Sequence, residues 1–229
     1  MFIISELRKL FKDTPSGIPL IGRDRYRSAA ITIPILSIGQ EVHLLFEQRA
    51  VAVPQGGEIC FPGGEFDAKH DTTLQDTALR ETREELGIGR SDIELLGLLG
   101  TVLTLRGHAV DCFGALLSVP DPAMPAIDTR EVARTFTVPI EWFRCNPPKL
   151  HRVGVEVHPQ HITPDGSQTT LFPAKKLGLP ERYHHSWRVR DYEVLVYATP
   201  EGVIWGMTAQ VIAELIHRYN GRSSIVIGR

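Results

Sequence analysis

Hydrophobic positions in the N-terminal part of the chain follow two periods, first that of a helix and then that of paired strands. In residues 3–12 the hydrophobic side chains recur at helical spacing, which predicts a short amphipathic helix. Residues 29–36 are apolar and partly β-branched and predict a strand, in which Pro34 indicates an edge position or a bulge near the end. Residues 42–46 predict a second strand, and residues 37–40 between them suit a hairpin turn. We therefore expect a helix followed by a β-hairpin.

The rest of the chain alternates short apolar runs with two longer amphipathic segments. Residues 74–86 and 208–219 carry hydrophobic side chains at helical spacing and predict helices. Residues 120–125 predict a turn, and the polar, proline-containing residues 159–189 predict a long loop or an irregular hairpin. Strand-like or apolar segments lie at residues 58–61, 93–105, 109–119, 132–142, 150–157 and 192–197. Strands flanked by two or three helices favour an α/β sandwich over a parallel, doubly wound sheet.

Composition and charge narrow the class of protein. The chain has 229 residues, of which 42 % are hydrophobic and 23 % are charged, and its formal net charge is −2. Such a composition is typical of a globular protein that can bury its own core in a single large domain. We expect no nucleic-acid or membrane partner, because there is no basic excess and no apolar run of about 20 residues. Three widely spaced cysteines predict reduced thiols and a cytoplasmic location.

The predicted helix at 74–86 carries three glutamates on one face. Glu81, Glu84 and Glu85 stand at positions i, i+3 and i+4, so they share a face of the helix. Glu85 lies nearest the apolar side of the helix and should be partly shielded from water. That apolar side is formed by Leu74, Ala78, Leu79, Thr82 and Leu86.

Three carboxylates on one helical face repel one another unless a cation lies among them. Arg80 stands four residues before Glu84 and can pair with it, which leaves Glu81 and Glu85 available for a cation. Oxygen ligands of this kind suit Mg²⁺ or Mn²⁺, which retain several waters and bridge to substrate phosphates. The simpler alternative is a solvated acidic face that holds no ligand.

A pair of glycines upstream of this helix favours the metal site over the solvated face. In Phe61-Pro62-Gly63-Gly64 the glycines let the backbone approach a ligand closely, and the carbonyl of Gly64 can join a metal shell. The loop that follows leads into the acidic helix, so the glycines and the carboxylates can meet at one site. Gly87 is expected to end the helix in the left-handed conformation.

Residues 64–88 resemble the Nudix box, G-x5-E-x7-R-E-U-x-E-E-x-G-U, in which U is a bulky aliphatic residue. Residues 80–88 match the second half of the box except at Thr82, which replaces an aliphatic residue. The first half departs from it, because Gly64 and Arg80 are sixteen positions apart rather than fourteen, and the early glutamate is absent. Asp67 or Asp71 is available to replace that glutamate.

The flanking segments are similar to the coenzyme A diphosphatase branch of the Nudix superfamily. That branch carries L-L-T-x-R-[SA] and then G-E-V-x-F-P-G-G. Residues 44–50 of this chain read Leu-Leu-Phe-Glu-Gln-Arg-Ala, and residues 57–64 read Gly-Glu-Ile-Cys-Phe-Pro-Gly-Gly. Residues 131–140 are similar to the pattern E-V-x-x-V-F-x-V-P-L, and residues 204–209 to I-W-G-x-T-A.

The resemblance covers about residues 29–143 and 192–216. It implies one Nudix hydrolase domain over residues 1–229, an α/β/α sandwich with a mixed sheet, with the helix at 3–12 and a long loop or hairpin insertion at about 144–190. The implied reaction is attack of water on one phosphorus of a nucleoside diphosphate linked to another moiety, assisted by Mg²⁺ or Mn²⁺. From coenzyme A or acyl-CoA the products would be 3′,5′-ADP and 4′-phosphopantetheine or its acyl form. A homodimer stays open.

The predicted metal ligands are the carboxylates of Glu81, Glu84 and Glu85 together with the carbonyl of Gly64. Glu84, with Arg80 beside it, is alternatively the residue that orients the attacking water. These two residues are therefore also the first candidates for a catalytic role.

Three further residues are candidates for catalysis or substrate binding. Glu131 is a possible general base delivered from a loop, and its simpler alternative is a surface or helix-capping glutamate. Arg49 can contact a substrate phosphate as a fork-shaped donor, and its simpler alternative is a surface strand end. Gly63 and Gly64 are expected to approach the substrate through their backbone.

Two other functions are compatible with the sequence. Val53 stands roughly where the coenzyme A branch carries a second arginine, which favours ADP-ribose, a dinucleotide or a nucleotide sugar as the substrate. The irregular first half of the box leaves open a non-catalytic Nudix-fold module that binds a ligand without turnover.

Overall fold

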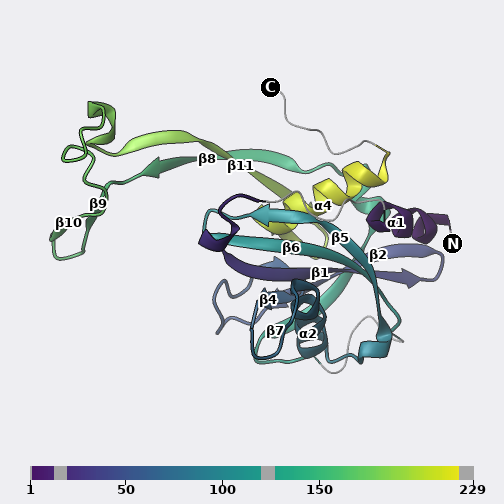
Figure 1. The fold of residues 1–229 in the computed structure, drawn as a ribbon. Helices are drawn as coiled ribbons and strands as arrows, with labels where there is room; N and C mark the ends of the chain where they lie inside the picture. The colour runs from purple at the N-terminus through teal and green to yellow at the C-terminus, as the bar shows by residue number, and fades with distance from the viewer. Residues whose placement is uncertain (1, 13–19, 120–126, 222–229) are drawn as a thin grey trace. The chain divides into compact units, whose positions relative to one another are not determined.

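Figure 1 shows the fold in a computed structural model that describes residues 2–12, 20–119 and 127–221. The chain forms two compact units. Unit 1 consists of Met1–Lys149 and Val196–Arg229, and unit 2 consists of Leu150–Leu195. The turn predicted at 120–125 lies outside the described residues. That the chain is one domain with an insertion at about 144–190 stays a prediction.

A mixed sheet forms the centre of unit 1. Within the described residues its seven strands are β1 (Arg27–Ile38), β2 (Glu41–Arg49), β3 (Ile59–Cys60), β4 (Gly63–Glu65), β5 (Ile93–Leu103), β6 (His108–Leu117) and β7 (Val132–Pro139). The order is β3-β2-β1-β6-β5, while β4 pairs with β1 and β7 pairs with β2. β1 and β6 run parallel, and β1 and β2 run antiparallel, which confirms the predicted mixed sheet.

β1 and β2 form the predicted hairpin, which turns at Gly39 with a φ of 61°. Pro34 lies within β1, which has neighbours on both sides and a continuous register with β6, so the predicted edge position or bulge is wrong. The N–H of Thr32 donates to the carbonyl oxygen of Pro62 (2.9 Å), and the pairing with β2 begins only at Ile35. Alternate residues of a strand point their N–H groups to the same side, so an N–H at Pro34 would point to the same side as that of Thr32. There it would fall in the gap between the contact with Pro62 and the start of the pairing with β2.

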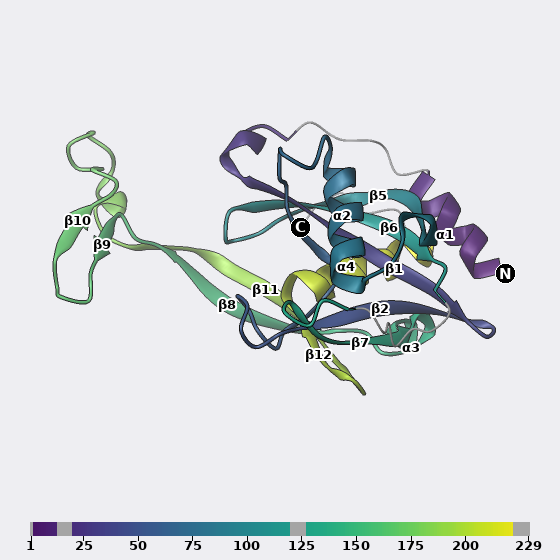
Figure 2. The same cartoon turned by 90° about the horizontal axis from the view of Figure 1, so that it is seen from below.

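Helix α2 (Leu74–Leu86) has the predicted boundaries and covers one face of the sheet (Figures 1 and 2). The hydroxyl of Thr73 accepts from the backbone N–H of Asp76, whose carboxylate accepts in return from the N–H of Thr73, so the first turn is capped. Gly87 ends the helix in the left-handed conformation at φ 62°, as predicted. The helix packs on the sheet through a cluster formed by Leu36, Leu45, Leu79, Leu86, Ile93, Ala115 and Leu117.

The opposite face of the sheet is covered by α1 (Phe2–Lys12) and α4 (Gly206–Tyr219), as Figures 1 and 2 show. The ring of Phe11 lies over Gly114, where a Cβ atom would overlap it. Successive residues of a strand face opposite sides, and Phe113 and Ala115 pack in the clusters that hold residues of α2. Unit 1 is therefore an α/β/α sandwich, which confirms the predicted fold class.

The remaining elements of unit 1 lie around the β2–β7 side of the sheet. The apolar segment at 132–142 divides into β7 and the start of α3 (Ile140–Cys145). β12 (Gly202–Trp205), which was not predicted, pairs with the end of β11 (Trp187–Thr199). The ring of Phe143 packs against those of Phe46 and Tyr197, with centroid distances of 5.9 and 5.2 Å, and holds these elements together. Two short 3-10 turns are η1 (Arg23–Arg25) and η2 (Arg90–Asp92).

Unit 2 has more regular structure than a loop. It contains most of β8 (Lys149–Val157) and of β11, which are neighbours in one sheet. The short strands β9 (Gln160–Ile162) and β10 (Gln168–Thr170) form an antiparallel hairpin and precede η3 (Glu181–Tyr183). A hairpin thus occupies residues 160–170 of the segment 159–189, and the remainder contains η3 and the start of β11. Most side chains of this unit are exposed.

Candidate functional site

The three glutamates of α2 differ strongly in their exposure to solvent. Glu85 is buried, with 3 % of its surface accessible, because it lies beside the apolar side of the helix. The side chain of Glu81 is 15 % exposed and that of Glu84 is 60 % exposed. The predicted shielding of Glu85 is thus confirmed and is more complete than expected. Burial raises the pKa of Glu81 and raises that of Glu85 to about 9.

The glycine pair and the acidic face of α2 meet, as the sequence predicted. The backbone N–H of Gly63 donates to Oε2 of Glu85 at 2.9 Å. A Cβ atom on Gly64 would overlap the carboxylate of Glu81, and one on Gly63 would overlap the backbone of β1 at Ala30. Gly63 therefore requires glycine, because its backbone passes close to that of β1, whereas a side chain at Gly64 would displace the carboxylate of Glu81.

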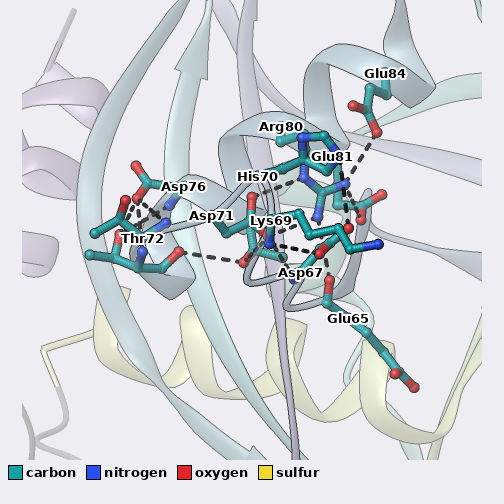
Figure 3. Close-up of polar contacts among 12 residues, drawn as sticks. Glu65, Asp67, Lys69, His70, Asp71, Thr72, Asp76, Arg80, Glu81 and Glu84 are labelled. Carbon is teal, nitrogen blue, oxygen red and sulfur yellow. Dashed lines mark hydrogen bonds and ion pairs between the residues drawn. The ribbon is translucent and has the colours of Figure 1, made fainter.

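Arg80 links the outer carboxylates of the site, as Figure 3 shows. Its Nε and Nη2 atoms donate to the two carboxylate oxygens of Asp71, both at 2.9 Å. Its Nη1 atom donates to Glu81 (2.7 Å) and to Glu84 (3.2 Å), which confirms the predicted pairing with Glu84. Hydrogen bonds from Arg80 hold the pKa of the Asp71 carboxyl well below its usual range.

Of the two aspartates available to replace the missing early glutamate, Asp71 is the one that contacts Arg80. The side chain of Asp71 is fully buried and receives the fork of Arg80. Asp67 lies next to it, and the backbone N–H of Asp67 donates to Oδ2 of Asp71 at 3.0 Å. The loop with its two extra residues thus brings an acidic partner to Arg80. That partner is Asp71.

The departure at Thr82 is matched by a polar residue on the sheet. The hydroxyl oxygens of Thr82 and Thr32 are 2.7 Å apart, and both residues are fully buried. Each hydroxyl lies within hydrogen-bond distance of the carbonyl oxygen of Ala78, at 2.6 Å for Thr82 and 3.1 Å for Thr32. A polar side chain is tolerated between helix and sheet here because its hydroxyl has partners on both elements.

A fourth glutamate, which the sequence analysis did not single out, lies in the sheet below this helix. Glu47 of β2 is only 1 % exposed, and its Oε1 accepts a hydrogen bond from the thiol of Cys60 at 3.2 Å. Burial raises the pKa of Glu47 to about 7, and the charges of Glu131 and Glu81 add to the rise. The charge of Glu47 in turn contributes to the raised pKa of Glu85. Glu47 is followed in β2 by the polar residues Gln48 and Arg49, so no local pattern in the sequence marked it as buried.

The three cysteines differ in their surroundings. All three are free thiols, and Cys112 is buried, whereas Cys145 is exposed. Cys60 is partly buried and takes part in the polar contact with Glu47.

Arg49 and Glu131 lie at the same end of the sheet. Arg49 is half-buried, and its Nε donates to the carbonyl oxygen of Pro54 at 3.0 Å. The positive charge of Arg49 opposes the rise in the pKa of Glu47 and Glu85. Glu131 is exposed, and its backbone carbonyl accepts from the N–H of Ala50 at 2.8 Å. The phosphate contact of Arg49 and the general-base role of Glu131 stay predictions.

The donors at this site are of the kind that a divalent metal ion of the Mg²⁺ type prefers. Carboxylates and backbone carbonyls predominate, and Oε2 of Glu47 is buried without a hydrogen-bond partner. Among the described residues no three Asp, Glu, His or Cys side chains converge closely enough to hold an ion as they stand. Glu81 instead accepts from Arg80, and Glu85 accepts from the N–H of Gly63. A metal would exchange these contacts for its own.

None of the helices in the described part of the chain has the length and apolar character required to span a membrane.

Comparison with known proteins adds to this geometry. Residues 25–160 match the NUDIX domain. A Nudix hydrolase named NudL from Escherichia coli is 31 % identical over 201 residues, which cover 86 % of each chain. The NudL of Photorhabdus laumondii is 28 % identical over 195 residues, which cover 84 % of each chain.

Solved structures of lower similarity include a Caenorhabditis elegans Ap4A hydrolase, with 20 % identity and a TM-score of 0.42 over 51 % of this chain and 83 % of that one. The NUDIX domain of Shewanella oneidensis NrtR, complexed with ADP ribose, has 23 % identity and a TM-score of 0.41 over 53 % of this chain and 78 % of that one. Neither bears on the substrate of the present chain.

The matched domain and the NudL relatives together cover both the acidic helix and the glycine pair. Nudix hydrolases act on pyrophosphate bonds of small nucleotide substrates, in general a nucleoside diphosphate linked to another moiety. They generally use a divalent metal ion, typically Mg²⁺. The chain belongs to the Nudix hydrolase family.

Proposed function

We propose that this chain is a coenzyme A or acyl-CoA diphosphatase that depends on Mg²⁺ or Mn²⁺ and yields 3′,5′-ADP and 4′-phosphopantetheine or its acyl form. One observation carries the proposal. The segments 57–64 and 204–209, whose patterns resemble the coenzyme A branch, are far apart in the sequence, but β3 of the first segment contacts β12, whose last two residues begin the second. A Cβ atom on Gly202, two residues before the second segment, would lie 2.8 Å from Cδ1 of Ile59 of β3.

In the proposed reaction the residues around the glycine pair have separate tasks. Glu81, Glu85 and the carbonyl of Gly64 would hold the metal ion, with Glu84 as a further ligand or as the residue that orients water. The bound ion would neutralise the diphosphate and lower the pKa of water. The pairing of Arg80 with Asp71 supports this assignment, because it fixes the guanidinium that positions the outer carboxylates.

The remaining steps belong to residues at the edge of the sheet. Arg49 would bind a phosphate oxygen, and the backbone at Gly63 and Gly64 would let the diphosphate approach closely. Glu131 would accept the proton of the attacking water while the new P–O bond forms and the anhydride P–O bond breaks. The leaving phosphate takes the electron pair of the broken bond.

The test is a substrate panel with identification of the products. The purified protein is incubated with Mg²⁺ or Mn²⁺ and with coenzyme A, acetyl-CoA, 3′-dephospho-CoA or ADP-ribose. We expect 3′,5′-ADP from coenzyme A and a lower rate on the dephospho form. Absence of product from coenzyme A together with rapid cleavage of ADP-ribose would rule out the proposed substrate.

The second candidate is a diphosphatase for ADP-ribose, a dinucleotide or a nucleotide sugar. Two observations favour it: Val53 brings no charge to this part of the site, and Arg49 already donates to the carbonyl oxygen of Pro54. Equal rates on coenzyme A and its 3′-dephospho form would support it, because the 3′-phosphate would then make no contribution to recognition. Ligand binding without turnover of any diphosphate would instead indicate a non-catalytic module.

A further inference from the structure

Three adjacent strands place polar side chains side by side beneath α2. Glu47 of β2 is the register partner of Cys60 on β3 and of Thr135 on β7. Residues that pair directly across antiparallel strands point to the same face of the sheet. Glu47 is thus flanked on both sides by side chains that can form hydrogen bonds, on a strand whose preceding residues, Leu44 to Phe46, are buried and hydrophobic.

Two of these side chains have buried atoms without a partner. Oε1 of Glu47 accepts from Cys60, but its Oε2 atom and the hydroxyl of Thr135 have no hydrogen bond. Within the described residues only four buried side-chain polar atoms are in this state, and the other two are Nη2 of Arg23 and Nδ1 of His43. A buried polar atom without a partner is costly, so two at paired positions indicate a place where a ligand binds.

The charged groups that face this place are mostly negative. The charges of Glu81 and Glu131 raise the pKa of Glu47, and the charge of Glu131 also raises that of Glu81. The charges of Glu47 and Glu81 raise the pKa of Glu85, while Arg49 supplies positive charge from the end of β2. Arg80, the other cation of the site, directs its hydrogen bonds to Asp71, Glu81 and Glu84 on the outer side of the helix. The inner carboxylates therefore have less compensating charge than the outer ones, and a cation would correct this imbalance.

We propose that Glu47 supplies an additional carboxylate to the metal centre, from the sheet side, and that the hydroxyl of Thr135 forms a hydrogen bond within that metal's shell. The proposal rests on the metal centre of the proposed function. It assigns Oε2 of Glu47 to the ion, while Oε1 keeps the hydrogen bond from Cys60, which orients the carboxylate. Glu85 and Glu47 would then face the same ion from the helix and from the sheet.

The test measures Mn²⁺ binding to the full chain by calorimetry, without substrate. Glu47→Gln keeps the shape of the side chain and should weaken the Kd for Mn²⁺ by about 10–100-fold. Water proton relaxation by bound Mn²⁺ should rise in this variant, because water replaces the lost carboxylate. Thr135→Val should weaken binding by less, about threefold, since only one hydrogen bond is removed. Glu156→Gln, an exposed residue of unit 2, is the matched control and should bind as the wild type does.

A second variant protects the test against a failure to fold. The double variant Glu47→Thr with Thr135→Val removes both buried polar atoms that lack a partner, and it should fold and bind Mn²⁺ as weakly as Glu47→Gln. Unchanged Mn²⁺ affinity in Glu47→Gln, while Glu85→Gln loses binding, would overturn the role of Glu47 and leave the metal centre intact. Absence of Mn²⁺ binding by the wild type would overturn the metal centre itself, and the role of Glu47 with it.

Discussion

The carboxylates on the two sides of α2 have opposite electrostatic surroundings. On the outer side, Asp71, Glu81 and Glu84 all contact Arg80, and the pKa of Asp71 is well below its usual range. On the inner side, Glu47 and Glu85 are buried, and their pKa values are raised to about 7 and about 9. Arg80 supplies the countercharge of Asp71 and Glu84 on the outer side. Burial raises the pKa of Glu81 despite its contact with Arg80, so Glu81 shares with the inner carboxylates the need for a proton or a metal ion.

This difference separates two tasks that the sequence motif presents as one. The outer network consists of a bidentate ion pair that ties the loop at Asp71 to the helix, which is a positioning task. On the inner side, Oε2 of Glu47 is a buried acceptor without a hydrogen-bond partner, as expected for a group that binds a ligand. The predictions below break one side of the comparison at a time.

The largest effect is expected on the inner side, from Glu85→Gln. Removing this carboxylate should lower kcat with the best diphosphate substrate on the order of 100–1,000-fold, because the charge that holds the ion is lost. Steady-state rates at saturating Mg²⁺ measure this effect. Glu156→Gln is the control and should keep wild-type activity. A Glu85→Gln enzyme with wild-type kcat would remove the basis for the inner site.

On the outer side, Arg80→Ala should reduce the free energy of unfolding by about 3 kcal/mol at neutral pH, because the buried Asp71 would lose its partner. The pKa of Asp71 is lower in the folded protein than in the unfolded protein. The ion pair therefore contributes fully above the pKa that Asp71 has when unfolded, and this contribution is lost as the pH falls through the lower pKa of the folded protein. Urea unfolding in EDTA at pH 7 and at low pH measures the difference.

Asp71→Asn combined with Arg80→Ala serves as the control for this prediction. The double variant should lose less stability than the sum of the single variants, because the two residues interact directly. Additive losses would show that the ion pair does not couple the loop to the helix.

The inner carboxylates should make the stability of the metal-free protein change with pH in the opposite direction. Because the pKa values of Glu47 and Glu85 are raised, the folded state binds more protons than the unfolded state between about pH 4.5 and the raised values of about 7 and 9. Stability in EDTA should therefore fall as the pH rises through this range, on the order of 1 kcal/mol per pH unit. Thermal unfolding from pH 5 to pH 9 measures it.

Saturating Mn²⁺ should flatten this pH profile, because the ion replaces the protons. Glu47→Gln should flatten the profile in EDTA as well, since one of the two raised groups is removed. A metal-free profile that rises through the same range would contradict the assignment of these carboxylates.

The smallest effect is expected from the hydroxyl pair between α2 and β1. Thr82→Val should reduce stability by about 1 kcal/mol, because Thr32 loses one of its two buried partners. Replacing both threonines by valine should cost less than the single change, because no unpaired hydroxyl remains. Unfolding by urea distinguishes the two cases, and equal losses would indicate that the hydroxyls do not interact.

Local features of the site were predictable from the sequence. The boundaries of α2, its end at Gly87 and the shielding of Glu85 follow from side chains a few residues apart, whose spacing determines the helical face on which they lie. The contact between the glycine pair and the carboxylates was also predictable, because only a short loop connects them.

Features that depend on partners distant in the sequence were not predictable. Glu47 is buried beside Cys60 and Thr135 only because three strands align at this point, and no local pattern encodes that register. Pro34 was expected at a sheet edge and lies in an inner strand, since it falls between two neighbouring strands.

By itself, the sequence determined the fold class, the acidic helix and the glycine pair, because each depends on periodicity or on short-range spacing. Only the tertiary structure decided that Asp71 rather than Asp67 receives Arg80, that Thr32 accompanies Thr82, and that a fourth carboxylate lies under the helix. These contacts are made across helix, sheet and loop. They depend on burial and on strand register, which arise only when distant segments pack together.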